Sequence, residues 1–540
     1  MNKKTYPVLK PDFIGFILTV ISIFLTVRIG IFNGFNFGFT IGLFALIITG
    51  LIYLYTKECK DKRFCTLLTI GALILCCSYS VTNDALIKFL TLIYLIFICA
   101  TVFLTISANS NAQDGSYSYI VNTVQKSFYA VFNNFALPFR SAKESAKSGK
   151  SKNAMYLLIG LGISVPILCI ILPLLATSDI AFGTLISKIF ENAFVLVGAV
   201  IVTIIITPFI YSFMFSAKKK DLEDNSFKGL PEKTPKVILN TILGATAFVY
   251  IAYLISQLAY ISKAFAFLLP ENYSAAEFAR SGFFQMAAIA FINVVILFIC
   301  AVFVKKTESR KIPTSTKSLL IFLCLFTVFY ISTAFVKMMK YISLYGLTRL
   351  RVLTSVFMIM LAVIFVIILL KLIFTKIKYI KAIILVCTVT LICVSVVDIN
   401  TVIANYNYNA YKKGEIQIDV EQISTLGVSG LPVLVNLTEE KPLEENVDTV
   451  CEIQRIGYYI YENSLHFAEE CTEENLIKTN VFQQNFAWKR GKAAIDQFVK
   501  NHPNFKYAEF FGEYNDEYDE EYDEEYDDEY YDEYYEEEEW

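Results

Sequence analysis

Histidine is nearly absent from this chain of 540 residues, which has only His466 and His502. Both lie near the C-terminal end, so the long apolar stretches before them contain no histidine to act as a general base or a metal ligand. The sequence also lacks the phosphate-binding Gly-x-x-x-x-Gly-Lys pattern and the His-Glu-x-x-His pattern of zinc proteases. We therefore predict no catalytic residue, no metal site and no cofactor, and we favour a protein that is not an enzyme. Chemistry by carboxylates stays open.

Charge is also scarce, at 18% of residues, whereas 55% are hydrophobic. A soluble domain of ordinary composition is less apolar and shorter than this. Of the 50 acidic residues, 18 lie between Glu513 and Trp540, where there is no lysine or arginine. This tyrosine-containing acidic repeat predicts a self-repelling, disordered tail. The rest of the chain carries a net positive charge.

Eleven apolar segments are long enough to be membrane helices, with ends uncertain by a few residues. They are residues 13–31, 37–55, 64–80, 85–107, 155–176, 193–215, 237–260, 274–304, 318–337, 353–370 and 382–397. Gly34, Gly38 and Gly42, at a spacing of four, predict close approach of a neighbouring helix. The fold class expected is an all-α polytopic membrane protein.

Lysine and arginine give the predicted orientation, because cytoplasmic loops are enriched in both. Of the 47 basic residues, 28 lie on the side that contains the N-terminus, nine lie on the opposite side and ten follow the last segment. We therefore expect a cell-membrane protein with a cytoplasmic N-terminus and an extracytoplasmic C-terminus. One missed or additional helix would reverse the C-terminal assignment.

Composition divides the chain into five regions. Residues 1–107 hold the first four membrane helices, and residues 108–154 form a cytoplasmic loop with an interfacial helix and a basic patch. Residues 155–397 hold helices five to eleven, and residues 398–511 form a small, mainly helical extracytoplasmic domain. The acidic tail is residues 512–540. Cys451 and Cys471 lie in the extracytoplasmic domain, where they can form a disulfide.

A polar stretch before the eighth segment, residues 272–285, predicts how that helix begins. Ser274 and Glu277 have the spacing of a capping box, which satisfies backbone N–H groups at a helix start. Arg280 opposes the helix dipole there and requires an anionic partner or a ligand. Glu277 is within reach, so a structural ion pair is the alternative to a binding site.

Several other polar residues lie on the outer face in this topology, including cations on the side that should be poor in them. We predict that they converge on a polar site suited to an anionic headgroup or a small anion. The candidate ligand-binding residues are Asp179, Gln257, Glu277, Arg280, Tyr341, Arg349 and Arg351.

Four stretches together resemble an uncharacterised bacterial multi-pass membrane family, a domain of unknown function in the four-one-five-three and four-one-seven-three group. They are Leu-Leu-Ala-Thr-Ser-Asp-Ile-Ala-Phe at 174–182, Tyr-Ser-Ala-Ala-Glu-Phe-Ala-Arg-Ser-Gly-Phe-Phe at 273–284, the segment 341–351 with its Tyr-Gly-Leu-Thr core, and the segment 405–419. The resemblance implies no activity, substrate or catalytic residue.

Three functions fit the sequence. The first is a non-enzymatic sensor, scaffold or assembly factor with an outer-face polar site. The second is a transporter or channel for a lipid or a small anionic solute, and the third is an enzyme on a lipid-linked substrate that uses Asp179 or Glu277 as acid or base. Membrane lipids and a protein that binds the extracytoplasmic domain are the expected partners, and nucleic acid is not.

Overall fold

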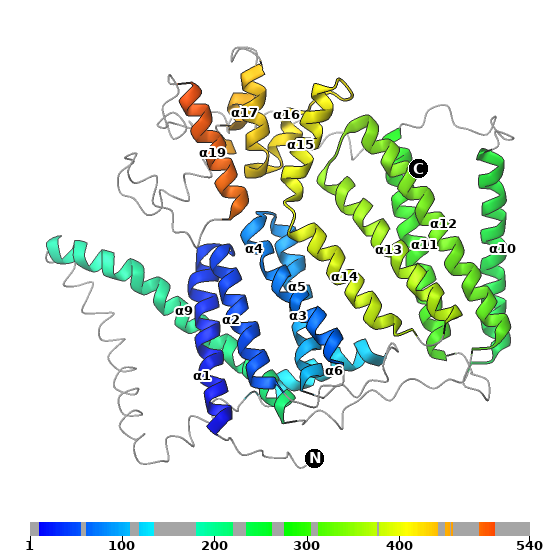
Figure 1. Ribbon diagram of the computed structural model, residues 1–540, viewed down its shortest axis with the longest axis horizontal. Helices are drawn as coiled ribbons and strands as arrows, with labels where there is room; N and C mark the ends of the chain where they lie inside the picture. Colours follow the sequence, from blue (N-terminus) through cyan, green and yellow to red (C-terminus); the bar gives the residue numbers. More distant parts are fainter. Residues whose placement is uncertain are drawn as a thin grey trace, which may run out of the picture. The chain divides into compact units, whose positions relative to one another are not determined.

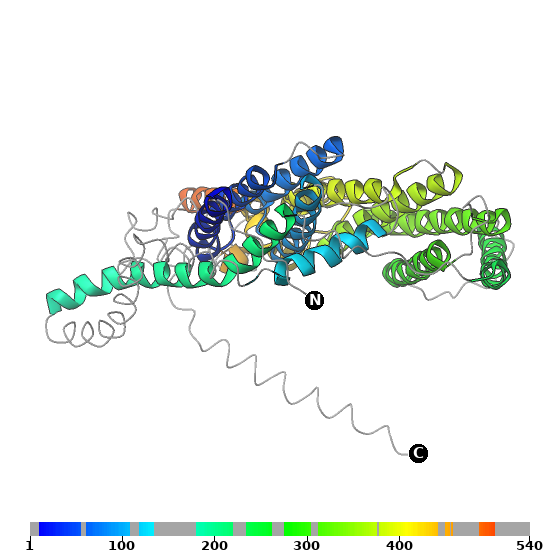
Figure 2. The same cartoon turned by 90° about the horizontal axis from the view of Figure 1, so that it is seen from below.

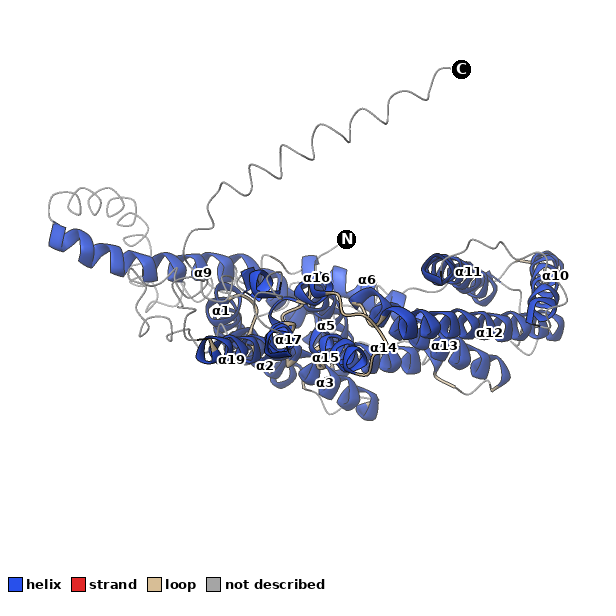
Figure 3. Cartoon of the chain, turned by 90° about the horizontal axis from the view of Figure 1, so that it is seen from above, coloured by secondary structure: helices blue, strands red, loops and turns tan. Residues whose placement is uncertain are grey.

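The computed structural model describes residues 10–55, 61–107, 118–133, 135, 180–219, 234–261, 275–303, 312–374, 377–440, 449–453, 455–456 and 485–502. Among these residues the regular elements are all helices, with no β-strand (Figure 3). The described chain forms two compact units, residues 1–417 with 480–486, and residues 418–479 with 487–540.

Membrane-spanning character is confirmed for many of these helices. Nine helices in the described part of the chain are long and apolar enough to cross a bilayer, or ten if one bent pair counts as a single span. The predicted segment 155–176 lies outside the described residues. The expectation of an all-α polytopic membrane protein is therefore confirmed.

Short connections join the first helices of the first unit, and these helices pack closely together (Figure 1). They are α1 (Lys10–Leu25), which continues as a π-helix (Thr26–Gly30) and a 3₁₀ turn (Ile31–Asn33), then α2 (Phe37–Leu54), α3 (Lys62–Cys76), α4 (Ser78–Val81) and α5 (Ala85–Ile106). A Cβ on Gly42 would lie 2.4 Å from Thr26 Cα, so glycine permits the contact of α2 with the end of α1. Gly34 has a φ of +82° and forms the turn between them.

An amphipathic helix and a very long helix follow. Helix α6 (Ser118–Asn133) falls in the predicted interfacial region, with Phe128 and Phe132 exposed and Thr123 buried. Helix α9 (Ile180–Lys218) runs through Pro208 without a break (Figure 2). The sixth predicted membrane segment begins at residue 193, but the helix in the structure begins at Ile180, because no glycine or proline lies at that boundary.

Helices α10 (Lys236–Ile261), α11 (Ala275–Phe303), α12 (Thr314–Tyr345) and α13 (Arg349–Ile373) share a second core. Helix α11 begins next to Ser274, where the capping box predicted a helix start. Tyr250 of α10 stacks on Phe326 of α12, with ring centroids 3.9 Å apart. Asn293 of α11, which is fully buried, accepts a hydrogen bond from Tyr250 Oη at 2.7 Å and donates to Thr327 Oγ1 at 2.8 Å.

Replacing Asn293 with leucine is expected to weaken the association of α10, α11 and α12. Interhelical hydrogen bonds in membranes contribute about 0.6–2 kcal/mol, so we expect a loss of about 1 kcal/mol in unfolding free energy. Denaturant unfolding in detergent micelles measures it. Replacing the exposed neighbour Ile292 with valine is the matched control. An equal effect of both substitutions would show that the hydrogen bonds contribute nothing.

The last helices of the first unit form a bent pair, α14 (Tyr379–Ser395) and α15 (Ile399–Lys412), whose axes differ by 60°. Helix α14 packs against α3, α5 and α13. Tyr94 Oη of α5 donates to the carbonyl of Ile384 at 2.8 Å. This contact connects the N-terminal helices to the C-terminal end of the unit.

The second unit is a small helical assembly built from α16 (Val420–Ser424), a 3₁₀ turn (Gly427–Ser429), α17 (Leu431–Glu440) and most of α19 (Phe486–Asn501). Its fully buried side chains include Ile423, Leu434, Ile495 and Phe498. A Cβ on Gly491 would lie 2.3 Å from Val428 Cγ1, so α19 approaches the 3₁₀ turn closely. The described residues of this unit are helical, and the predicted extracytoplasmic domain at 398–511 stays a prediction.

Candidate functional site

The ion pairs described in the first unit lie at two ends of the helices. We call the end with the helix connections at residues 34–36, 82–84 and 346–348 the Asp84 end. The opposite end, at which α1, α3 and α14 begin, is the Asp12 end. Figure 1 shows these helix starts at the end opposite the starts of α2, α5 and α13.

Asp84 is a buried carboxylate with two tasks. Its Oδ1 accepts a hydrogen bond from the backbone N–H of Ile87 at 3.1 Å and so caps α5. Its Oδ2 forms an ion pair with Arg349, the first residue of α13. The Asp84 side chain is 1% exposed and the Arg349 side chain 39% exposed. The pair therefore joins α5 to α13 across 265 residues of sequence.

Arg351 closes the end of α12. Its Nη1 donates to the carbonyls of Tyr345 at 2.8 Å and Gly346 at 2.6 Å, and its Nη2 donates to Tyr341 Oη at 3.0 Å. The guanidinium also lies 4.1 Å from the centroid of the Tyr341 ring. A cation at a helix C-terminus satisfies carbonyls that have no helical partner and stabilises the dipole.

Asn407 of α15 holds the backbone of the turn after α12. Its Oδ1 accepts from the N–H of Leu347 at 2.7 Å, and its Nδ2 donates to the Leu347 carbonyl at 2.8 Å. Gly346 has a φ of +73°, and a Cβ there would lie 2.7 Å from Asn407 Oδ1. The turn therefore requires glycine, both for its conformation and for the close approach of Asn407.

An amide cluster joins three further connections at the same end. Asn36 Oδ1 accepts from Lys88 Nζ at 2.9 Å and from Asn485 Nδ2 at 3.0 Å. Asn485 also donates to Asn83 Oδ1 at 3.1 Å. These contacts fix residue 485, which belongs to the first unit, against the connections before α2 and α5.

At the Asp12 end, two carboxylates each meet two lysines. Asp12, 1% exposed, lies 3.7 Å from Lys218 Nζ and 2.8 Å from Lys219 Nζ. Tyr53 Oη donates to Asp12 Oδ1 at 3.1 Å. This group connects α1, α2 and α9.

The second carboxylate, Asp61, pairs with Lys378, at 3.5 Å, and with Lys381. Lys381 is 5% exposed, and its Nζ lies 5.4 Å from the ring centroid of Phe64 and 5.3 Å from that of Tyr119. These contacts hold the start of α14 against α3 and α6.

The predicted ligand-binding residues divide into two sets. In the described set, Tyr341 contacts Arg351, and Arg349 forms an ion pair with Asp84. Asp179 and the side chains of Gln257, Glu277 and Arg280 lie outside the described residues. Ligand binding by the seven predicted residues stays a prediction. The three that the structure describes, Tyr341, Arg349 and Arg351, contact other groups of the protein.

The predicted disulfide also stays untested. Cys451 is exposed. Its predicted partner Cys471 lies outside the described residues.

Asp84 and Asn407 were not among the predicted site residues. Thr-Asn-Asp before an apolar run is an N-cap signal, so the capping role of Asp84 was readable from the sequence. Its pairing with Arg349 was not readable, because no local pattern joins residues so far apart. In the described part of the chain, no group of three His, Cys, Asp or Glu side chains is placed to hold a metal ion.

Apolar helices long enough to span a bilayer, joined at their ends by ion pairs and amide clusters, define an integral multi-pass membrane protein. The family described as domain of unknown function DUF4153 matches residues 69–437, more than half of the chain. The chain belongs to this family. The match begins within α3 and ends within α17. No curated protein and no solved structure matches the chain.

Proposed function

We propose that the protein is a non-enzymatic scaffold of the bacterial cell membrane that carries its second unit on the extracytoplasmic face. The observation that supports this most is the use of the polar residues at the Asp84 end. Arg349 forms an ion pair with Asp84. Arg351 donates hydrogen bonds to the end of α12, and Asn407 forms hydrogen bonds with the turn after α12. Side chains used in this way hold helix ends at fixed positions.

The hydroxyl groups within the helices support the same proposal. Many threonines, for example Thr101, Thr105 and Thr203, donate to the carbonyl four residues earlier in their own helix. A hydroxyl that donates in this way needs no acceptor outside its own helix within the membrane.

The proposed orientation places the Asp12 end in the cytoplasm, because the lysines at the ends of α9 and α13 and at the starts of α3 and α14 lie there. Cys451 then faces the extracytoplasmic side. A membrane-impermeant maleimide, added to intact cells after an impermeant reductant, is expected to label Cys451 in the Cys471→Ser variant. The double variant that also has Cys451→Ser gives the background. Labelling that requires permeabilised cells would contradict the orientation.

A complementation experiment separates a scaffold from an enzyme. Cells that lack the protein are supplied with Asp179→Asn, Glu277→Gln or Arg280→Gln chains at equal membrane level. A scaffold is expected to retain the wild-type phenotype in each case. If a variant of unchanged unfolding midpoint loses the phenotype, the proposal fails and an enzyme on a lipid-linked substrate is favoured.

Two observations favour the second candidate, a transporter. The helix pair α14–α15 is bent by 60°, and broken helices form binding sites in transporters. Ser78 Oγ, Thr91 Oγ1 and Ser395 Oγ, on α4, α5 and the end of α14, are buried and have no hydrogen-bond partner within the described residues. Uptake of a labelled small anion into liposomes that contain the purified protein, above that of empty liposomes, would establish this alternative.

A further inference from the structure

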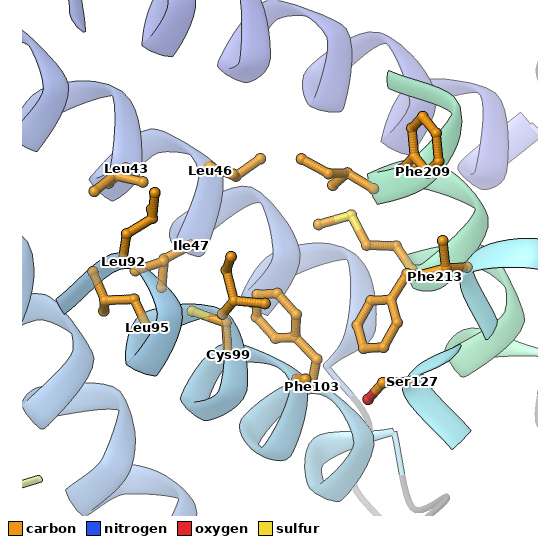
Figure 4. Close-up of a pocket in the computed structure, with 15 residues that line it drawn as sticks. Leu43, Leu46, Ile47, Leu92, Leu95, Cys99, Phe103, Ser127, Phe209 and Phe213 are labelled. Carbon is orange, nitrogen blue, oxygen red and sulfur yellow. The ribbon is translucent and has the colours of Figure 1, made fainter. Parts of the chain in front are cut away.

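A cavity of about 260 Å³ lies among α2, α5, α6 and α9. Its wall includes Leu43 and Ile47 of α2, Leu95 and Phe103 of α5, Ser127 of α6 and Phe213 of α9 (Figure 4). We call it the α5–α9 groove. Among its described lining residues, Ser127 alone carries a hydroxyl, and that hydroxyl donates to the Thr123 carbonyl at 2.6 Å. The groove therefore offers apolar surface and no polar group for a hydrophilic ligand.

The length of the groove matches one leaflet of a bilayer. Along α5 its wall runs from Leu92 to Phe103, and eleven steps of about 1.5 Å give roughly 16 Å. Half of a hydrocarbon core of roughly 30 Å is about 15 Å. The groove extends from the middle of the α5 span toward the Asp12 end, because Phe103 is near the last turn of α5.

Helix α6 borders the groove at the Asp12 end and has the character of an interfacial helix. Its side chains Ser127 and Val131 line the groove, while Phe128 and Phe132 are more than 60% exposed. Large exposed apolar side chains on an amphipathic helix enter the boundary between headgroups and acyl chains. A chain in the groove would therefore have its polar end at the level of α6.

In the part of the chain that the structure describes, the charge at the end of α9 is positive. Met214 lines the groove, and Lys218 lies one turn further along the same face of α9. Lys218 and Lys219 share the single carboxylate of Asp12, so this group keeps one net positive charge. Anionic headgroups are attracted to such a site, whereas zwitterionic headgroups gain less.

We propose that the α5–α9 groove binds one acyl chain of an anionic phospholipid, whose headgroup lies beside Lys218 and Lys219. The groove supplies the apolar wall for the chain, and the lysine pair supplies the complementary charge. Lipid binding in the groove does not depend on the proposed orientation of the protein. The orientation determines only which leaflet supplies the lipid, and the proposed orientation gives the cytoplasmic leaflet.

The test uses the full chain in nanodiscs of phosphatidylglycerol that contain a trace of phosphatidylglycerol with a photoreactive diazirine in one acyl chain. After illumination, crosslinked peptides are identified by mass spectrometry. We expect crosslinks at the lining residues Cys99 and Met214 with at least a fivefold higher yield than at Ile93, an exposed residue of α5. Equal yields at lining and exposed residues would overturn the proposal.

Two groove-filling variants provide the second arm. Ala100→Phe in α5 and Val131→Phe in α6 each place a ring in the groove. Each is expected to reduce the crosslinks at Met214 at least fivefold, while Ile93→Phe, at an exposed position that does not line the groove, leaves them unchanged. The unfolding midpoint of each variant shows whether the fold is retained, and a variant that fails this check is replaced by the other. Retained crosslinks in a folded, filled variant contradict the proposal.

The headgroup is tested by exchanging the probe for phosphatidylcholine with the same diazirine chain. A threefold or greater loss of crosslinking at Met214 is expected for the wild-type chain. An equal crosslinking yield at Met214 with the two probes would overturn the role of Lys218 and Lys219. If the yield at Met214 is no higher than the yield at Ile93 with either probe, the whole proposal is overturned.

Discussion

Replacing Arg349 with methionine is expected to lower the unfolding free energy by about 2–3 kcal/mol. The substitution leaves the Asp84 carboxylate, which is 1% exposed, without its cation. Removing one partner of a fully buried pair costs about 3–5 kcal/mol, and the exposure of Arg349 reduces that figure. Denaturant unfolding in detergent micelles measures the loss.

Two further variants make this result specific. Lys340→Met removes an exposed cation near the end of α12 and is expected to change the free energy by less than about 0.5 kcal/mol. Asp84→Asn keeps an N-cap residue but removes the charge. Arg349→Met is therefore expected to cost less in the Asp84→Asn background than in the wild-type chain. An Arg349→Met effect no larger than that of Lys340→Met would show that the pair does not join α5 to α13.

Replacing Asn407 with leucine is expected to cost about 2–4 kcal/mol. Asn407 is 3% exposed, and its amide satisfies both the N–H and the carbonyl of Leu347. Each buried group left without a partner costs about 1–3 kcal/mol. The same unfolding measurement applies, and proteolysis at the 346–348 turn should become faster.

The same helix offers matched controls for Asn407. Asn405 and Asn409 of α15 are exposed, so Asn405→Leu and Asn409→Leu change the same residue type on the same element without breaking a buried contact. Both are expected to cost less than about 0.5 kcal/mol. If all three leucine variants behave alike, the turn is held by other contacts.

The sequence predicted the fold class because membrane helices leave a long, continuous apolar signal that depends on no distant contact. The start of α11 and the amphipathic helix α6 were predicted for the same reason, since capping and amphipathic patterns are local. The helix that contains the sixth predicted segment begins at Ile180 and not at residue 193. No glycine or proline at residue 193 would break the helix, so residues 180–192 continue into the span as part of α9.

The candidate site was predictable only in part. The cations at 349 and 351 were identified because they violate the expected distribution of charge across the membrane. Their partners were not identified, because Asp84 and Asn407 meet residues 341–351 only after the helices have packed. A cation on the unexpected face indicates that a partner is needed, but it does not indicate whether that partner is a ligand or the protein itself.

An experimental map of the full chain in native-lipid nanodiscs tests the central claim most directly. The account predicts Arg349 on Asp84, Arg351 on the end of α12 and Asn407 on Leu347, with no non-protein density between Tyr341 and the two arginines. A density of the shape of a lipid headgroup or a small anion, bonded to Arg349 or Arg351 in place of these protein partners, would contradict it. The Asp84 end would then be a ligand site and not a set of contacts that holds the helices together.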